Sequence, residues 1–119
     1  MKRIAVLIAA LGAAVGLMIP AVGSGASQAQ TIRVSEVSYR ITLSARPKAG
    51  VVRFVIRNAG DNPHDFWLRG GGKRWKSRVL GEGGSATLTA RLKKGVRYTY
   101  WCGVSDHASE GMRGSFVAR

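Results

Sequence analysis

The stretch that decides the fold is residues 96–102, Val96-Arg97-Tyr98-Thr99-Tyr100-Trp101-Cys102. Every second side chain, from Val96 to Cys102, belongs to one apolar face, and the side chains between them belong to the other. A period of two is typical of a half-buried β-strand. We therefore expect a strand here, with Cys102 at its end on the face that points into the core.

The same alternation extends outward along the chain. Residues 51–57 and 85–92 show it clearly, and weaker strands are expected at 31–37, 39–43, 66–69 and 115–118. Clusters of Gly, Pro and Asn between these segments predict turns. Residues 30–119 show no convincing helical periodicity. About seven short strands with frequent turns predict an all-β, antiparallel β-sandwich.

Residues 1–29 have the pattern of a secretory signal peptide. Lys2 and Arg3 precede an apolar run from Ile4 to Ile19, and small residues follow Pro20. We expect cleavage after Ala29, which leaves a domain of residues 30–119 in the periplasm or outside the cell. The alternative is an uncleaved N-terminal membrane anchor.

Charge and cysteine content narrow the function. The chain carries a net charge of +13, and without residues 1–29 it keeps 17 basic and 6 acidic residues, or +11. Export argues against nucleic acid, so such a charge favours an acidic protein or an anionic surface as the partner. Cys102 is the only cysteine, which excludes an internal disulfide and leaves an intermolecular link, a free thiol or a metal ligand.

Candidate ligands gather near the ends of strands. Four residues separate Cys102 from His107, and four more separate His107 from Met112. The other histidine, His64, follows a turn at residues 58–63. Two imidazoles, a thiolate and a weak thioether are the ligand set of a type 1, or blue, copper site. We expect a single copper ion that alternates between Cu(II) and Cu(I).

Several motifs share a family pattern: Asn58-x-Gly60, His64-x-Phe66, Val96-x-Tyr98-x-Tyr100-x-Cys102, His107 and Gly111-Met112-x-Gly114. Over roughly residues 31–119 they resemble the cupredoxin family. The resemblance implies a Greek-key β-sandwich with copper at one end. It also implies that His64, Cys102 and His107 are equatorial ligands and that Met112 is the axial ligand.

The chain departs from the family beside its first histidine. Many cupredoxins have Asn or Ser after this ligand, whereas this chain has Asp65. We expect Asp65 to accept hydrogen bonds from backbone N–H groups near Gly103 and so to orient the ligands. The alternative is a solvated or turn-capping carboxylate.

A basic stretch lies between two expected strands. Residues 69–78 include Lys73, Arg74, Lys76 and Arg78, with Trp75 among them. One interpretation is a solvated, flexible loop. The other is a docking patch for an acidic redox partner or for an anionic lipid surface, which would accelerate encounter and weaken with salt.

Three functions remain open from the sequence. The first is a monomeric electron carrier, and the second is a copper chaperone or store that uses the same ligands. The third is a metal-free β-sandwich used in adhesion. An enzyme is not expected, because Cys102 and His107 lack an orienting partner of the triad kind and four protein ligands leave no open position for a substrate.

Overall fold

The computed structural model describes residues 9–17 and 28–119. Within these ranges the chain forms eight strands and no helix: β1 (Gln30–Val37), β2 (Arg40–Leu43), β3 (Gly50–Asn58), β4 (Trp67–Gly70), β5 (Lys73–Lys76), β6 (Ser85–Leu92), β7 (Arg97–Trp101) and β8 (Arg113–Val117). Residues 9–17 are exposed and belong to no strand. The predicted signal peptide, residues 1–29, lies largely outside the described residues and stays a prediction.

No helix within the described ranges is long and apolar enough to cross a lipid bilayer.

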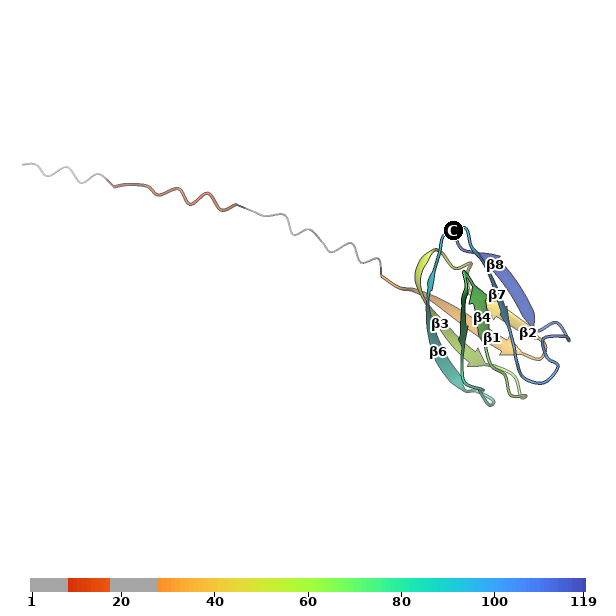
Figure 1. The fold of residues 1–119 in the computed structure, drawn as a ribbon. Coiled ribbons are helices and arrows are strands. Elements are labelled where there is room, and N and C mark those ends of the chain that lie inside the picture. The colour runs from red at the N-terminus through yellow and green to blue at the C-terminus, as the bar shows by residue number, and fades with distance from the viewer. Residues whose placement is uncertain (1–8, 18–27) are drawn as a thin grey trace, which may run out of the picture.

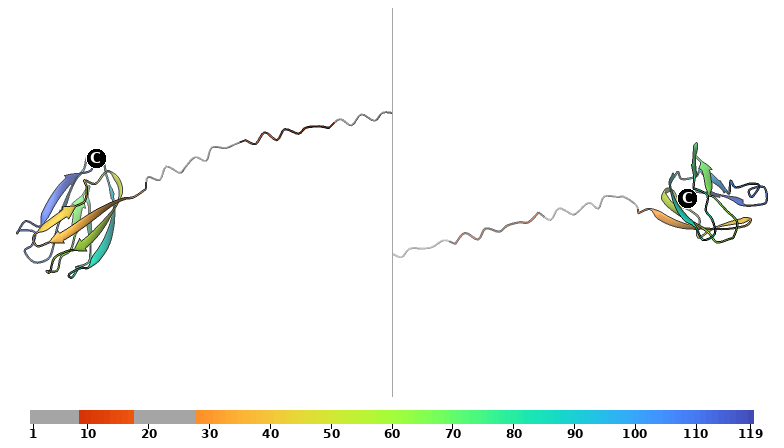
Figure 2. Two further views of the ribbon diagram at one scale, coloured as in Figure 1. Left: turned by 180° about the vertical axis from the view of Figure 1, so that it is seen from behind. Right: turned by 90° about the horizontal axis from the view of Figure 1, so that it is seen from below.

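The strands form two four-stranded sheets that face each other. One sheet has the order β2-β1-β3-β6 and the other the order β5-β4-β7-β8 (Figure 1). The views of Figure 2 show the same two layers from behind and from below. The all-β sandwich expected from the sequence is confirmed. One detail differs, because β1 pairs with β3 in parallel while the other strand pairs are antiparallel.

The core lies between the sheets and follows the predicted alternation. In β3 the inward side chains Val52, Phe54 and Ile56 are fully buried. The second sheet contributes aromatic rings, with Tyr98 stacked on Phe116 at a centroid distance of 5.7 Å. This packing fixes which side of β7 is inside, so Cys102 continues the buried face at 0 % exposure.

Strand β5 is the element that the sequence analysis did not expect. Gly71 and Gly72 both have positive φ, at 58° and 76°, and they join β4 to β5 as a two-residue turn. Such a turn matches the twist of a hairpin and favours glycine at both positions. The basic stretch is therefore not a flexible loop, since residues 73–76 pair in register with β4. The Gly-Gly pair was the signal that predicts this hairpin.

Gly70 makes the close approach of β4 to β7 permissible. A Cβ atom at this position would overlap the ring of the buried Tyr98 and the carbonyl oxygen of Arg97. We predict that Gly70→Ala destabilises the domain by about 1–3 kcal/mol, the usual range for overpacking a rigid site. Urea unfolding followed by tryptophan fluorescence measures this. Gly81→Ala, which meets no atom within 4 Å, is the control; equal midpoints for the two variants would contradict the prediction.

Candidate metal centre

The loop between β7 and β8 brings three candidate ligands together by backbone hydrogen bonds. The Cys102 N–H donates to the Met112 carbonyl at 3.0 Å, and the Met112 N–H donates to the His107 carbonyl at 3.0 Å. These bonds close the loop at its base and fold residues 103–111 back on themselves. Two residues in the loop adopt positive φ, Ser105 at 49° and Gly111 at 108°. The loop thus brings Cys102, His107 and Met112, which are evenly spaced in the sequence, close together.

A separate turn places His64. The Asn58 side chain is fully buried, accepts from the Gly60 N–H, and donates to the carbonyl oxygens of Asn62 and Leu80. His64 and Leu80 also exchange backbone hydrogen bonds of 3.1 and 2.7 Å. The turn is therefore fixed on both sides, and the imidazole of His64 is directed into the end of the sandwich.

The three side chains meet at the Cys102 sulfur. Cys102 Sγ lies 3.8 Å from His64 Nδ1 and 3.7 Å from His107 Nδ1. One potential ligand atom from each residue lies within 4.8 Å of the others, and all three residues are buried. The two imidazoles meet edge to face at a centroid distance of 5.1 Å. The sulfur is therefore flanked by two nitrogen atoms in a site without direct solvent access.

Burial sets the protonation of these groups in the metal-free protein. Desolvation, followed by the nearby His107, lowers the pKa of His64. Desolvation also raises the pKa of the Cys102 thiol, against hydrogen bonds that oppose the shift. At neutral pH the site therefore holds a neutral imidazole at His64 and a protonated thiol. A metal ion that binds here must displace the thiol proton.

The ligand set fits a soft cation such as copper. Both Nδ1 atoms face the sulfur, at 3.8 Å for His64 and 3.7 Å for His107. Met112 is fully buried, and its backbone bonds to Cys102 and His107 fix it beside them. The sequence-predicted residues His64, Cys102, His107 and Met112 are thus brought to one end of the sandwich.

Asp65 ties the two ligand-bearing segments together. Its Oδ1 accepts from the Gly103 N–H at 2.6 Å, and its Oδ2 accepts from Trp67 Nε1 at 2.9 Å. The first bond is the one expected from the sequence, and the second was not anticipated. A side chain at Gly103 would overlap the Trp67 indole, so glycine is required for this approach.

Glu36 is a buried carboxyl group near the site that the sequence analysis missed. It has no exposed surface, and neither carboxyl oxygen has a partner among the described residues. Desolvation, and next the charge of Asp65, raises its pKa from 4.5 to about 8. Its inward position in β1, after Ile32 and Val34, continues an apolar face, so the alternation of the strand was the available signal.

The raised pKa of Glu36 predicts a pH-dependent stability. Since the folded-state pKa lies above the unfolded value, the folded protein holds this proton more tightly, and stability falls as pH rises from about 4.5 to about 8. We predict that metal-free Glu36→Gln matches the wild type at pH 5 and exceeds it at pH 8 by several kcal/mol, at about 1.4 kcal/mol per pKa unit.

Chemical denaturation at both pH values, with a chelator present, measures the difference. Glu82→Gln, at an exposed position, is the matched control and should leave the pH dependence unchanged. A constant difference between Glu36→Gln and the wild type would show that Glu36 is ionised in the folded protein.

The fold has solved counterparts, although neither the protein-family models nor the curated proteins give a match. The reduced auracyanin of the photosynthetic bacterium Roseiflexus castenholzii superimposes with a TM-score of 0.64 at 16 % identity, over 78 % of this chain and 99 % of that one. Auracyanin B gives 0.66 at 20 % identity, over 78 % and 91 %. The chain has the cupredoxin fold.

A multicopper oxidase shares this fold with a TM-score of 0.56 at 18 % identity, over 75 % of this chain and 41 % of that one. The resemblance to cupredoxins noted in the sequence is therefore confirmed for the fold. The His64, Cys102 and His107 cluster fits the type 1 copper centre that cupredoxins hold.

Proposed function

We propose that the protein is an exported type 1 copper protein that carries single electrons between redox partners. The observation that carries the proposal is the placement of Cys102 Sγ between two imidazole Nδ1 atoms, at 3.8 and 3.7 Å, in a buried site. Copper held by His64, Cys102, His107 and Met112 would supply one-electron chemistry by alternating between Cu(II) and Cu(I).

The protein's own contribution is rigidity and exclusion of water. His64 and Cys102 have no exposed surface, and their backbones are held in place by a bridge to Leu80 and by the closed loop. Side chains fixed in this way cannot rearrange freely when the charge of the site changes. This favours fast electron exchange over metal release.

His107 is the ligand nearest to solvent. It is 8 % exposed, and the ring of Tyr39 packs edge-on against it with a centroid distance of 5.3 Å. Tyr39 itself is 44 % exposed. A partner that covers Tyr39 and His107 would reach the edge of the site without opening it.

The same burial argues against the other functions. A substrate has no direct access to Cys102 or His64, which disfavours an enzyme. A copper chaperone or store remains the alternative, since it would use the same four residues. The measurement that separates it from a carrier is the rate at which Cu(I) passes to an external chelator: slow exchange supports the carrier.

Addition of Cu(II) to the purified full chain tests the site. We predict an intense visible thiolate-to-copper charge-transfer band and narrow copper hyperfine splitting in the electron paramagnetic resonance spectrum. Cys102→Ser should abolish the band, because the thiolate is its source. Glu110→Gln, an exposed substitution in the same loop, should keep it. A colourless wild-type protein, or an ordinary tetragonal Cu(II) signal, would refute the proposal.

Met112 provides a second test, as the axial ligand. We predict that Met112→Gln keeps the colour but lowers the reduction potential, because a harder axial donor favours Cu(II) over Cu(I). Protein-film voltammetry of the two forms measures the shift. A potential equal to that of the wild type would show that Met112 does not bind the metal.

A further inference from the structure

The outer face of the β5-β4-β7-β8 sheet carries an ordered row of basic and aromatic side chains. The strand register aligns one residue from each strand: Lys76, Trp67, Trp101 and Arg113. Trp67 and Trp101 are direct cross-strand partners, and their rings stack at 5.7 Å with an interplanar angle of 17°. The row crosses the whole sheet at the end where β7 runs into Cys102.

Cations flank the paired indoles. Arg74 and Lys76 lie over the Trp67 ring at 5.5 and 5.1 Å, and Arg69 lies over Trp101 at 5.7 Å. These contacts hold long, flexible side chains against rigid rings. The face is therefore ordered before any partner binds, which reduces the entropy lost on association.

The charge of this face has one sign. Strands β4, β5, β7 and β8 contain no acidic residue, and five of their six basic residues, all except Lys73, share the face of the Trp pair by strand alternation. Asp65, whose carboxylate is bonded to Trp67, is 7 % exposed and already accepts two hydrogen bonds. An approaching partner thus meets positive charge around aromatic surface.

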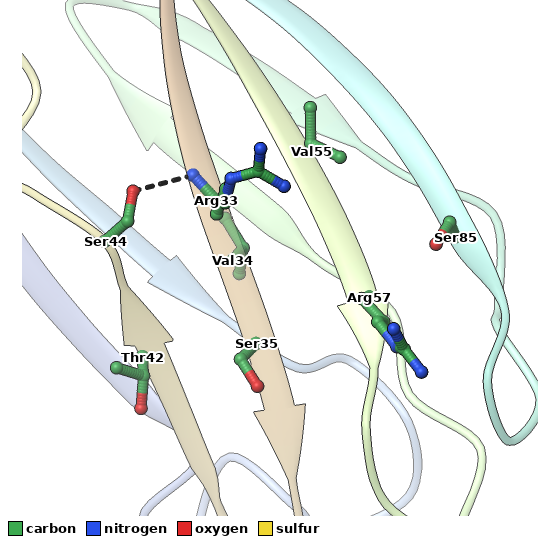
Figure 3. Close-up of a pocket in the computed structure, with 8 residues that line it drawn as sticks. All are labelled: Arg33, Val34, Ser35, Thr42, Ser44, Val55, Arg57 and Ser85. Atoms are coloured by element: carbon green, nitrogen blue, oxygen red, sulfur yellow. Dashed lines mark hydrogen bonds between the residues drawn. The ribbon is translucent and has the colours of Figure 1, made fainter.

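The outer face of the other sheet, β2-β1-β3-β6, is the natural comparison, because it also carries arginines. Figure 3 shows Arg33 on β1 and Arg57 on β3, around a pocket of about 410 Å³ lined otherwise by Ser, Thr and Val side chains. Aromatic side chains are absent from this lining. Trp and Arg, by contrast, are the residues most enriched among energetic hot spots of protein interfaces.

The Trp face is also connected to the proposed copper site. Trp101 is bonded covalently to Cys102, and Trp67 reaches Gly103 through the carboxylate of Asp65. The stack is thus connected to the chain on both sides of Cys102, because Trp101 precedes this residue and Trp67 is linked to Gly103, which follows it. The outer face of the other sheet has no such connection among the described contacts.

We propose that this Trp face, formed by Trp67, Trp101, Arg69, Arg74, Lys76 and Arg113, is a docking surface for an acidic protein. That this protein is a redox partner rests on the function proposed above, whereas the docking itself does not. A membrane surface fits less well, because the large apolar side chains exposed among the described residues are not on these strands: Leu11, Val15, Leu17, Tyr39 and Val79.

The proposed face shares Arg74 and Lys76 with the patch expected from the sequence and differs from it in its other members. Arg74 and Lys76 point outward beside Trp67, as that patch requires. Lys73 pairs with Gly70 in the register that places Leu68 and Trp75 inward, and Arg78 lies beyond β5, where it donates to the Ser85 carbonyl. We therefore leave Lys73 and Arg78 outside the surface.

The test uses a decaglutamate peptide as the acidic probe and the full chain, with and without copper. We predict saturable binding at low salt that shifts the indole N–H resonances of Trp67 and Trp101 more than that of Trp75. Arg74→Glu/Lys76→Glu should weaken binding by about tenfold or more, since like charges then oppose each other at the contact. Arg74→Gln/Lys76→Gln, which is less disruptive to folding, should weaken it by a smaller factor.

The matched control is Arg33→Glu/Arg57→Glu, which changes the net charge equally on the opposite face. Equal weakening by the two charge reversals would overturn the proposal, because only overall charge would then matter. Tighter binding of phosphatidylglycerol vesicles or of oligo(dT) than of the peptide would also overturn it.

The visible spectrum keeps the two proposals separable. Lost peptide binding in a protein that turns blue with copper refutes the docking surface alone. Intact, face-specific binding in a protein that stays colourless refutes the copper function alone.

Discussion

The carboxylate of Asp65 is the contact on which the site and its surroundings depend. It joins two segments 38 residues apart, by accepting from the Gly103 N–H beside the ligand loop while belonging to the segment of His64. Its second oxygen fixes the Trp67 indole on the outer face of the sheet. One buried side chain with two donors thereby links the segment of His64 to the ligand loop and connects both to the protein surface.

Around this contact, burial lowers the pKa of His64 and raises the pKa values of Cys102 and Glu36, which in each case favours the uncharged form. Burial keeps the Cys102 thiol protonated and the His64 imidazole neutral in the metal-free protein, so these two groups carry no charge until a cation arrives. Glu36, without a hydrogen-bond partner among the described residues, holds its proton for the same reason. This end of the sandwich is thus a low-dielectric pocket in which a bound cation would be the dominant charge.

The candidate ligands are rigid and buried, whereas the outer face of the second sheet is accessible to a partner. The backbone bridges at His64 and Leu80, with the closed loop before Met112, leave the ligands little freedom. The surface of the second sheet instead presents side chains that a partner can reach, ordered by stacking and cation–π contacts. The electron carrier proposed above would need both properties, because its metal site must stay fixed while its partners change.

The sequence by itself determined the strand alternation and the inward phase of Cys102, because period-two burial is a local property. The four candidate ligands followed from their chemistry and from the resemblance to cupredoxins. The sequence did not determine the β5 hairpin, the parallel pairing of β1 with β3, the burial of Glu36 or the Trp67–Trp101 stack. Those depend on strand register and on which sheets face each other. Only the tertiary structure decides such relations, since they join residues that no local pattern relates.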